Sequence, residues 1–168
     1  SIRVIQANIM ADDAHARFDA TMRRYRYRIL NRRIPSPLSS GRVWHLGQNL
    51  NVAAMHEAAQ LLVGKHDFTS FRATHCQASS PIRTIDQINI TEHNDEIHIA
   101  VSARSFLHHQ VRNITGSLVL IGQGKWTNAD LANALEQRQR SAAGQTAPAE
   151  GLYLTEVIYP YLTPASTG

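Results

Sequence analysis

The stretch with the most unusual chemistry is residues 106–118, FLHHQVRNITGSL. Apolar residues recur there every three or four positions, which predicts a helix over 106–121, capped by Ser105, with one face in the core. His108 and Arg112 are four residues apart, so in such a helix they would share a face beside the apolar stripe. An arginine there needs an anionic partner, because a buried unpaired charge is very costly. That partner is either an acid of this chain, which would make the arginine structural, or a group from elsewhere.

Gly116 lies about one helical turn beyond Arg112. Glycine inside a helix costs about 1 kcal/mol relative to alanine. Its presence indicates that another backbone or a ligand approaches the helix closely, although ordinary helix packing would also explain it.

Nine histidines raise the question of a metal centre. No His-Glu-x-x-His motif is present, and His108 and His109 would point about 100° apart on a helix. The adjacent pair His75-Cys76 has a poor geometry for chelation, so the spacing predicts no metal site. The sequence also lacks a Gly-x-Ser-x-Gly elbow and a glycine-rich phosphate loop, and it therefore predicts neither a serine nucleophile nor a cofactor site.

Arginine accounts for 15 of the 17 basic residues. Eight of these arginines lie within residues 17–42 and are opposed only by Asp19, so this segment carries +7 against +4 for the whole chain. The planar guanidinium binds phosphate oxygens in pairs and stacks on bases. The segment therefore predicts a phosphate-rich partner, with a solvated basic surface as the alternative.

The elements that must position these residues alternate between strands and helices. Alternating apolar residues and turn signals predict strands at 2–9, 17–30, 84–91, 96–102 and 152–159, with helices at 52–63, at 106–121 and from Thr127. This pattern predicts an α+β domain over residues 1–160, with a mainly antiparallel sheet and a helical layer on one face. A mobile tail is expected over 161–168.

The predicted strand 17–30 changes phase near Arg23-Arg24, which predicts a β-bulge at that point. After the bulge, Tyr25 and Tyr27 would face the core. Arg24, Arg26 and Arg28 would then line the opposite face.

Composition favours a soluble protein of the cytoplasm. Apolar residues make up 43% of the chain and charged residues 18%, which is ordinary for a globular domain. No apolar stretch is long enough for a membrane span, and no signal-peptide pattern opens the chain. The single cysteine, Cys76, cannot form an internal disulfide, which favours a reducing compartment.

Four stretches together resemble the bacterial tRNA pseudouridine synthase A family. They are HARFDA at 15–20 running into RYRY at 24–27, HDFTSF at 66–71, FLHHQVRN at 106–113, and AGQTAPAEGLYL at 143–154. The resemblance implies isomerisation of uridine in the tRNA anticodon stem-loop, without metal or cofactor. It also implies two similar α/β halves with joined sheets, an RNA cleft between them, and a homodimer.

This chain resembles only the C-terminal half of that family. The family's nucleophile is the aspartate of a Gly-Arg-Thr-Asp-Ala-Gly motif in the N-terminal half, and this motif is absent from the sequence. Arg83-Thr84-Ile85-Asp86 lacks the preceding glycine and lies in a strand pattern, so we assign it no catalytic role. The chain alone is therefore expected to be inactive. The rival hypothesis is a non-catalytic RNA-binding module.

The resemblance also implies roles for particular residues. Tyr25 matches the tyrosine that lies against the target base and is a candidate base for the C5 proton, with a purely structural tyrosine as the alternative. Arg112 matches the arginine that pairs with the nucleophile, and Leu152 and Leu154 are expected to pack beneath the site. Contacts with the tRNA are expected from Arg17, Arg23, Arg24, Arg26, Arg28, Arg32, Arg33 and His108.

Overall fold

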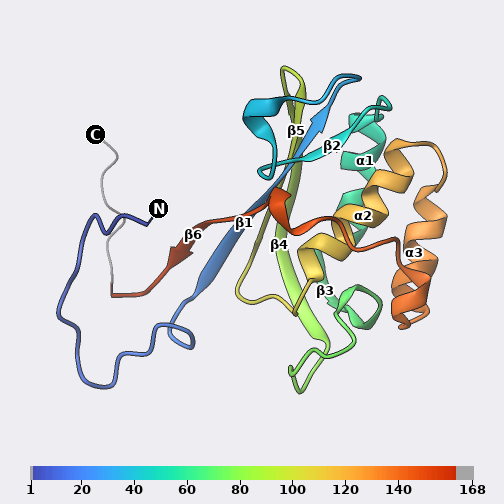
Figure 1. The fold of residues 1–168 in the computed structure, drawn as a ribbon. Coiled ribbons are helices and arrows are strands. Elements are labelled where there is room, and N and C mark those ends of the chain that lie inside the picture. The colour runs from blue at the N-terminus through green and yellow to red at the C-terminus, as the bar shows by residue number, and fades with distance from the viewer. Residues whose placement is uncertain (1, 162–168) are drawn as a thin grey trace.

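The computed structural model describes residues 2–161, in which a six-stranded sheet carries three helices on one side (Figure 1). The strands are β1 (Met22–Asn31), β2 (Trp44–Leu46), β3 (Gly64–Asp67), β4 (Ile82–His93), β5 (Glu96–Ala103) and β6 (Leu152–Ile158). The helices are α1 (Val52–Ala59), α2 (Gln110–Gly122) and α3 (Asn128–Glu136), and short 3-10 turns occur in several of the connections. The tail predicted as mobile lies, apart from Tyr161, outside the described residues.

Strand β1 is the centre of the sheet. One edge of β1 pairs with β5 along its length, and the other edge is shared by β6 in its first half and by β2 in its last three residues. Beyond β5 come β4 and then β3. Only the β1–β2 pairing is parallel. The prediction of a mainly antiparallel α+β sheet with a helical layer on one face is therefore confirmed.

The two faces of β1 carry the predicted residues, and the sheet is irregular between Arg24 and Tyr25, beside the predicted bulge, although the extra residue belongs to the neighbouring strand. Tyr27 and Ile29 are fully buried beneath the helices, whereas Arg24 and Arg26 are exposed. The β1–β5 pairing is uninterrupted, and the register shift lies in the β1–β6 pairing, where Thr155 of β6 is the extra residue. The apolar phase changes because the strand starts only at Met22, so the residues before it follow no strand alternation.

Helices α1 and α2 pack directly on the sheet, and α3 packs against α2. Ile114 and Leu118 of α2 are fully buried, as the predicted apolar stripe requires. The predicted start of α3 is confirmed by a capping box, in which Thr127 and Asp130 bond to each other's backbone N–H groups. Within residues 2–161, no helix has the length and hydropathy needed to cross a membrane.

Two predictions from the sequence are wrong. Residues 2–10 form no strand, and Ile2 and Ile5 are 96% and 98% exposed, because alternation alone cannot make a strand without an edge to pair with. Helix α2 begins at Gln110 rather than Phe106, because His109 has a left-handed backbone with φ 62°. His108 therefore precedes the helix and does not share a helical face with Arg112, as the predicted spacing required.

Candidate active site

Arg112 lies in the first turn of α2 and is held by the segment 143–148, which we call the strap. Its Nε–H donates to the carbonyl of Ala147 at 2.6 Å, and the N–H of Ala147 donates to the carbonyl of Arg112 at 3.2 Å. The side chain is half-buried, yet no carboxylate of residues 2–161 lies within ion-pair distance of it. The structural alternative, an ion pair with an acid of this chain, is thus not formed in the described part. The guanidinium is therefore held through Nε, and its two terminal nitrogens form no hydrogen bond within the described residues.

The strap approaches α2 so closely that glycine is required on both sides. A methyl group on Gly116 would overlap the carbonyl oxygen of Gln145, and one on Gly144 would lie 2.9 Å from the backbone of Ser117. The prediction that another backbone packs against Gly116 is therefore confirmed. This contact brings the strap to the helix end that carries Arg112.

Tyr25 and Tyr27 lie on the same face of β1 but differ in what their hydroxyls do. The hydroxyl of Tyr27 is buried and donates to the carbonyl of Pro148 at 2.7 Å. Burial, followed by the nearby charge of Glu150, raises the pKa of Tyr27 well above its usual range. Tyr25 is half-buried, its ring meets Phe106 edge-on at 5.2 Å, and its hydroxyl has no hydrogen bond within the described chain. Tyr27 is thus structural, whereas the phenol of Tyr25 is available.

Two short series of contacts connect Tyr25 with Arg112. Phe106, which contacts Tyr25, lies in the connection that leads directly into α2. Tyr27, two residues along β1 from Tyr25, bonds to Pro148, whose neighbour Ala147 bonds to Arg112. The structure therefore places both residues on the helix-covered side of the sheet, at the N-terminal end of α2.

Leu152 and Leu154 of β6 behave differently from each other. Leu152 is half-buried against the core, as expected. Leu154, which pairs with Tyr25 across the strands, is 53% exposed, so the expectation that it packs beneath the site is wrong. The extra residue Thr155 lies next to it and changes the register of the rest of β6. An apolar side chain is consequently left open beside Tyr25.

Basic residues surround the N-terminal end of α2. His108 is exposed, and its ring lies 4.0 Å from that of His109. Burial and the neighbouring charges of His108, Arg112 and Arg140 lower the pKa of His109. Arg140, which follows α3 in the chain, was not found from the sequence, since no motif there marks it.

Comparison with known proteins identifies the family. A family model described as tRNA pseudouridine synthase matches residues 58–160, which is more than half of the chain.

The chain belongs to the tRNA pseudouridine synthase family.

It is 54% identical to the tRNA pseudouridine synthase A of Rhodospirillum centenum over 94% of this chain and 64% of that protein. Identity to the namesake from Mesorhizobium japonicum is 53%, over 95% of this chain and 64% of the relative. Identity to the tRNA pseudouridine synthase A of Rhodospirillum rubrum is 54%, over 99% of this chain and 61% of that protein. The chain thus spans slightly less than two thirds of these relatives.

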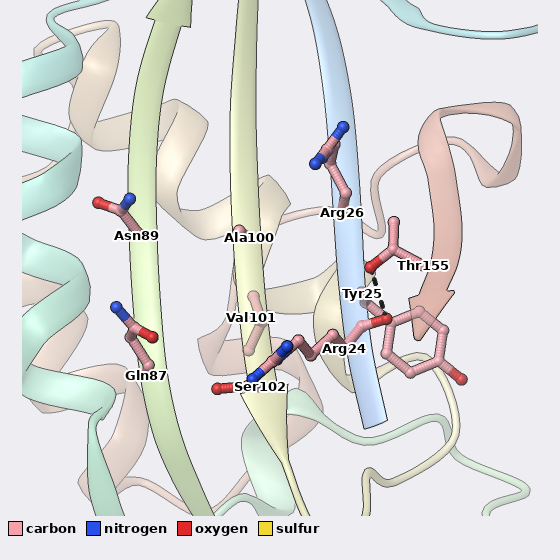
Figure 2. Close-up of a pocket in the computed structure, with 9 residues that line it drawn as sticks. All are labelled: Arg24, Tyr25, Arg26, Gln87, Asn89, Ala100, Val101, Ser102 and Thr155. Carbon is pink, nitrogen blue, oxygen red and sulfur yellow. Dashed lines mark hydrogen bonds between the residues drawn. The ribbon is translucent and has the colours of Figure 1, made fainter. Parts of the chain in front are cut away.

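Some of the arginines expected to contact RNA in this tRNA pseudouridine synthase family member lie on the other side of the sheet. Arg24 and Arg26 project from the face without helices, on the side of Gln87 and Asn89 (Figure 2). A shallow hollow of about 190 Å³ lies there, lined mainly by Arg24, Arg26, Gln87, Asn89, Ser102 and Thr155. Tyr25, which lies between these arginines on β1, also lines this hollow, whereas Arg112 does not.

Acids distant in sequence neutralise much of the arginine segment. Arg24 pairs with Glu156, Arg28 with Glu96 at 2.7 Å, and Arg32 with Asp95 at 3.1 Å. Arg23 instead donates to the backbone carbonyls of Ala20, Arg104 and Arg17. The charge of +7 counted within residues 17–42 is therefore partly offset in the fold, because that count included only acids of the segment itself. Arg17, Arg26 and Arg33 form no ion pair within residues 2–161.

Proposed function

We propose that residues 1–160 form the C-terminal domain of a tRNA pseudouridine synthase that isomerises uridine in the anticodon stem-loop. The observation that carries this proposal is the environment of Arg112. Its half-buried guanidinium is anchored through Nε alone and has no acid of the described chain beside it. Because a half-buried charge requires compensation, the site suits a carboxylate supplied by another part of the protein.

In this proposal Arg112 holds the nucleophilic aspartate. A guanidinium beside a carboxylate keeps the carboxylate ionised, and its planar fork fixes the direction of both oxygens. The aspartate assists cleavage of the bond between N1 of uracil and C1′ of the ribose. The base then rotates and a bond forms between C5 and C1′. The C5 proton leaves and N1 gains a proton, so the product is an isomer of the substrate.

Tyr25 is the proposed contact with the target base. A base must leave its stack before an enzyme can act on it, and an aromatic ring provides a surface for the displaced base. The phenol of Tyr25, free of hydrogen bonds in the described structure, is the candidate acceptor of the C5 proton. Exposed Leu154 lies next to Tyr25 and extends the apolar surface offered to the base.

Among the predicted RNA contacts, the structure favours the end of the sheet where α2 begins. His108 is exposed there, and its neighbour His109 lies close to Arg112 and Arg140. Arg17, Arg26 and Arg33 keep the ability to bind phosphate, while the internal pairs of Arg24, Arg28 and Arg32 reduce theirs. Arg23 is assigned a structural role. Action in the cytoplasm and assembly as a homodimer complete the proposal, in keeping with tRNA as the substrate.

A C5-tritium release assay on uridine-labelled tRNA tests this function. The chain alone should release no tritium. The protein extended N-terminally to the length of its relatives should release it, and Arg112→Ala should abolish release while leaving tRNA affinity largely unchanged. If the extended protein binds tRNA without releasing tritium, the rival hypothesis of a non-catalytic RNA-binding module is correct. If Arg112→Ala lowers affinity rather than rate, Arg112 contacts phosphate.

A further inference from the structure

Arg140 directs its guanidinium entirely at the strap. Its terminal nitrogens donate to the carbonyl of Gly144 at 2.9 Å, to the carbonyl of Ala143 at 3.3 Å and to the hydroxyl of Thr146 at 2.9 Å. The side chain is half-buried, and no acid within residues 2–161 pairs with it. The charge of Arg140 is thus used to hold backbone and hydroxyl groups of one short segment.

Thr146 passes this contact on to α2. Its hydroxyl accepts from Arg140 and donates to Oδ1 of Asn113 at 2.7 Å. Asn113 is 1% exposed, follows Arg112 in the helix, and donates through Nδ2 to the carbonyl of Phe71 at 2.8 Å. The hydroxyl of Thr146 therefore both accepts and donates, and neither bond could be made by an apolar side chain of the same shape.

The strap is tied down on both sides of Thr146. Before it, the N–H of Gly144 donates to the hydroxyl of Ser117 at 2.9 Å. After it comes Ala147, which exchanges two hydrogen bonds with Arg112. The carbonyl that receives Nε of Arg112 is thus one residue from the hydroxyl that Arg140 and Asn113 hold.

We infer that Thr146, held between Arg140 and Asn113, is a positioning residue for Arg112. These three residues, the Arg140–Thr146–Asn113 clamp, fix the carbonyl of Ala147, and this carbonyl fixes the plane of the guanidinium. The two outer nitrogens of Arg112 then face a constant direction, as a pairing with a catalytic carboxylate requires. This inference rests on the proposed function for its catalytic meaning, but its geometric part can be tested separately.

The geometric part is tested on the chain itself by the NMR signal of the Arg112 Nε–H group. Thr146→Val keeps the shape of the side chain but removes both hydrogen bonds, whereas Thr146→Ser keeps them. In the valine variant, exchange of this proton with water should be faster by about 10-fold or more. This factor corresponds to a decrease of roughly 1.4 kcal/mol in the free energy needed to open the hydrogen bond of Arg112 Nε–H. Serine should leave it unchanged. Unaltered exchange in the valine variant, with α2 amides equally protected, would overturn the clamp.

The catalytic part is tested by tritium release from tRNA with the N-terminally extended protein. Thr146→Val should lower kcat on the order of 10- to 100-fold, because small misplacements of catalytic groups have effects of that size. KM should stay unchanged and Thr146→Ser should remain active. If kcat is unaffected while exchange at Arg112 rises, the clamp is only structural. If the unmodified extended protein releases no tritium, the proposed function fails, and the NMR result still decides the geometry.

A second pair of variants covers the case in which Thr146→Val does not fold. Arg140→Lys keeps the charge but cannot make three hydrogen bonds in one plane. Arg138→Lys is the matched control, because Arg138 lies two residues away with a 68% exposed side chain and contacts Asp67 at 3.4 Å, not the strap. We expect lower kcat and faster exchange of the Arg112 Nε–H proton only in the position 140 variant. Equal behaviour of the two variants would refute the assignment.

Discussion

Arginines on the two sides of the sheet differ in whether an acid of the same chain neutralises them. On the face without helices, Arg24 and Arg28 are paired with acids of the same chain. On the helix-covered side, Arg112 has fixed geometry but no acidic partner in the described chain. Abundance of arginine therefore marks a stabilised surface here, whereas one incompletely compensated arginine marks the candidate site. The unpaired Arg26 of the face without helices is exposed to solvent, so partial burial without an acidic partner, rather than local charge density, distinguishes Arg112.

The most direct test of this difference is to remove one arginine from each side of the sheet and to compare the effects on kcat. Arg112→Ala should lower kcat of the extended protein by at least about 10²- to 10³-fold, the scale found when a fixed charge-stabilising donor is lost. Arg24→Ala should change kcat little, because its pair with Glu156 is exposed. Tritium release from tRNA measures both. Comparable losses in the two variants would contradict the division into a functional and a structural face.

Tyr25 and Tyr27, which lie on one face of β1, allow a functional and a structural role to be compared directly. Tyr25→Phe should lower kcat by about 10²-fold, the lower end for loss of a general base, with thermal stability unchanged. Tyr27→Phe should instead cost about 1 kcal/mol of unfolding free energy, because the carbonyl of Pro148 loses its buried donor. Single-turnover kinetics and urea unfolding separate these effects. A Tyr25→Phe variant with full activity would leave Tyr25 as a structural residue only.

Gly116→Ala tests how tightly the helix-covered side is packed. The added methyl group would meet the carbonyl of Gln145, so we expect a loss of about 1–3 kcal/mol, typical of overpacking. Gly47→Ala is the control, since a methyl group there would lie 3.6 Å from its nearest neighbour, an ordinary contact. Denaturant unfolding of the chain measures both. A neutral Gly116→Ala would show that the strap can move away from α2.

The smallest expected effect is the contribution of the Arg28–Glu96 pair, on the face without helices, to the pH dependence of stability. The hydrogen bond from Arg28 is the main cause that lowers the pKa of Glu96 from 4.5 to about 2. A depressed pKa in the folded state adds stability above the ordinary value, and this stability disappears as the pH falls toward 2. Because both side chains remain partly solvated, we expect a contribution of about 1 kcal/mol. Unfolding of the unmodified chain should therefore depend more steeply on pH in this range than that of Glu96→Gln.

The fold could be predicted from the sequence where one local pattern decided the outcome. The period of α2, the start of α3 at Thr127 and the strands β4 and β5 were all predicted for that reason. Predictions failed where a partner was decisive: residues 2–10 found no strand to pair with, and the extra residue of the bulge lies in β6 rather than β1. The start of α2 depends on one left-handed residue, His109, and no composition rule indicates it.

The candidate site was predictable only in part. Arg112 stood out because an arginine beside an apolar stripe needs a partner, and Gly116 because glycine is unfavourable in a helix. Arg140 and Thr146 could not be found, since their roles arise from a loop that folds back on α2. The ion pairs of Arg24, Arg28 and Arg32 were invisible for the same reason, because their acids come from other strands and turns.

The strap also bears on where this chain can accommodate extra residues. By composition 143–148, AGQTAP, looks like an ordinary surface connection, the usual choice for an inserted tag or a lengthened loop. Its Gly144 and Ala147 are nevertheless as inaccessible as core residues. Insertion there should disrupt the protein as severely as insertion into a central strand. The connection at 34–42, in which Pro35, Pro37 and Ser40 are exposed, is the better place for a fluorophore or an affinity label.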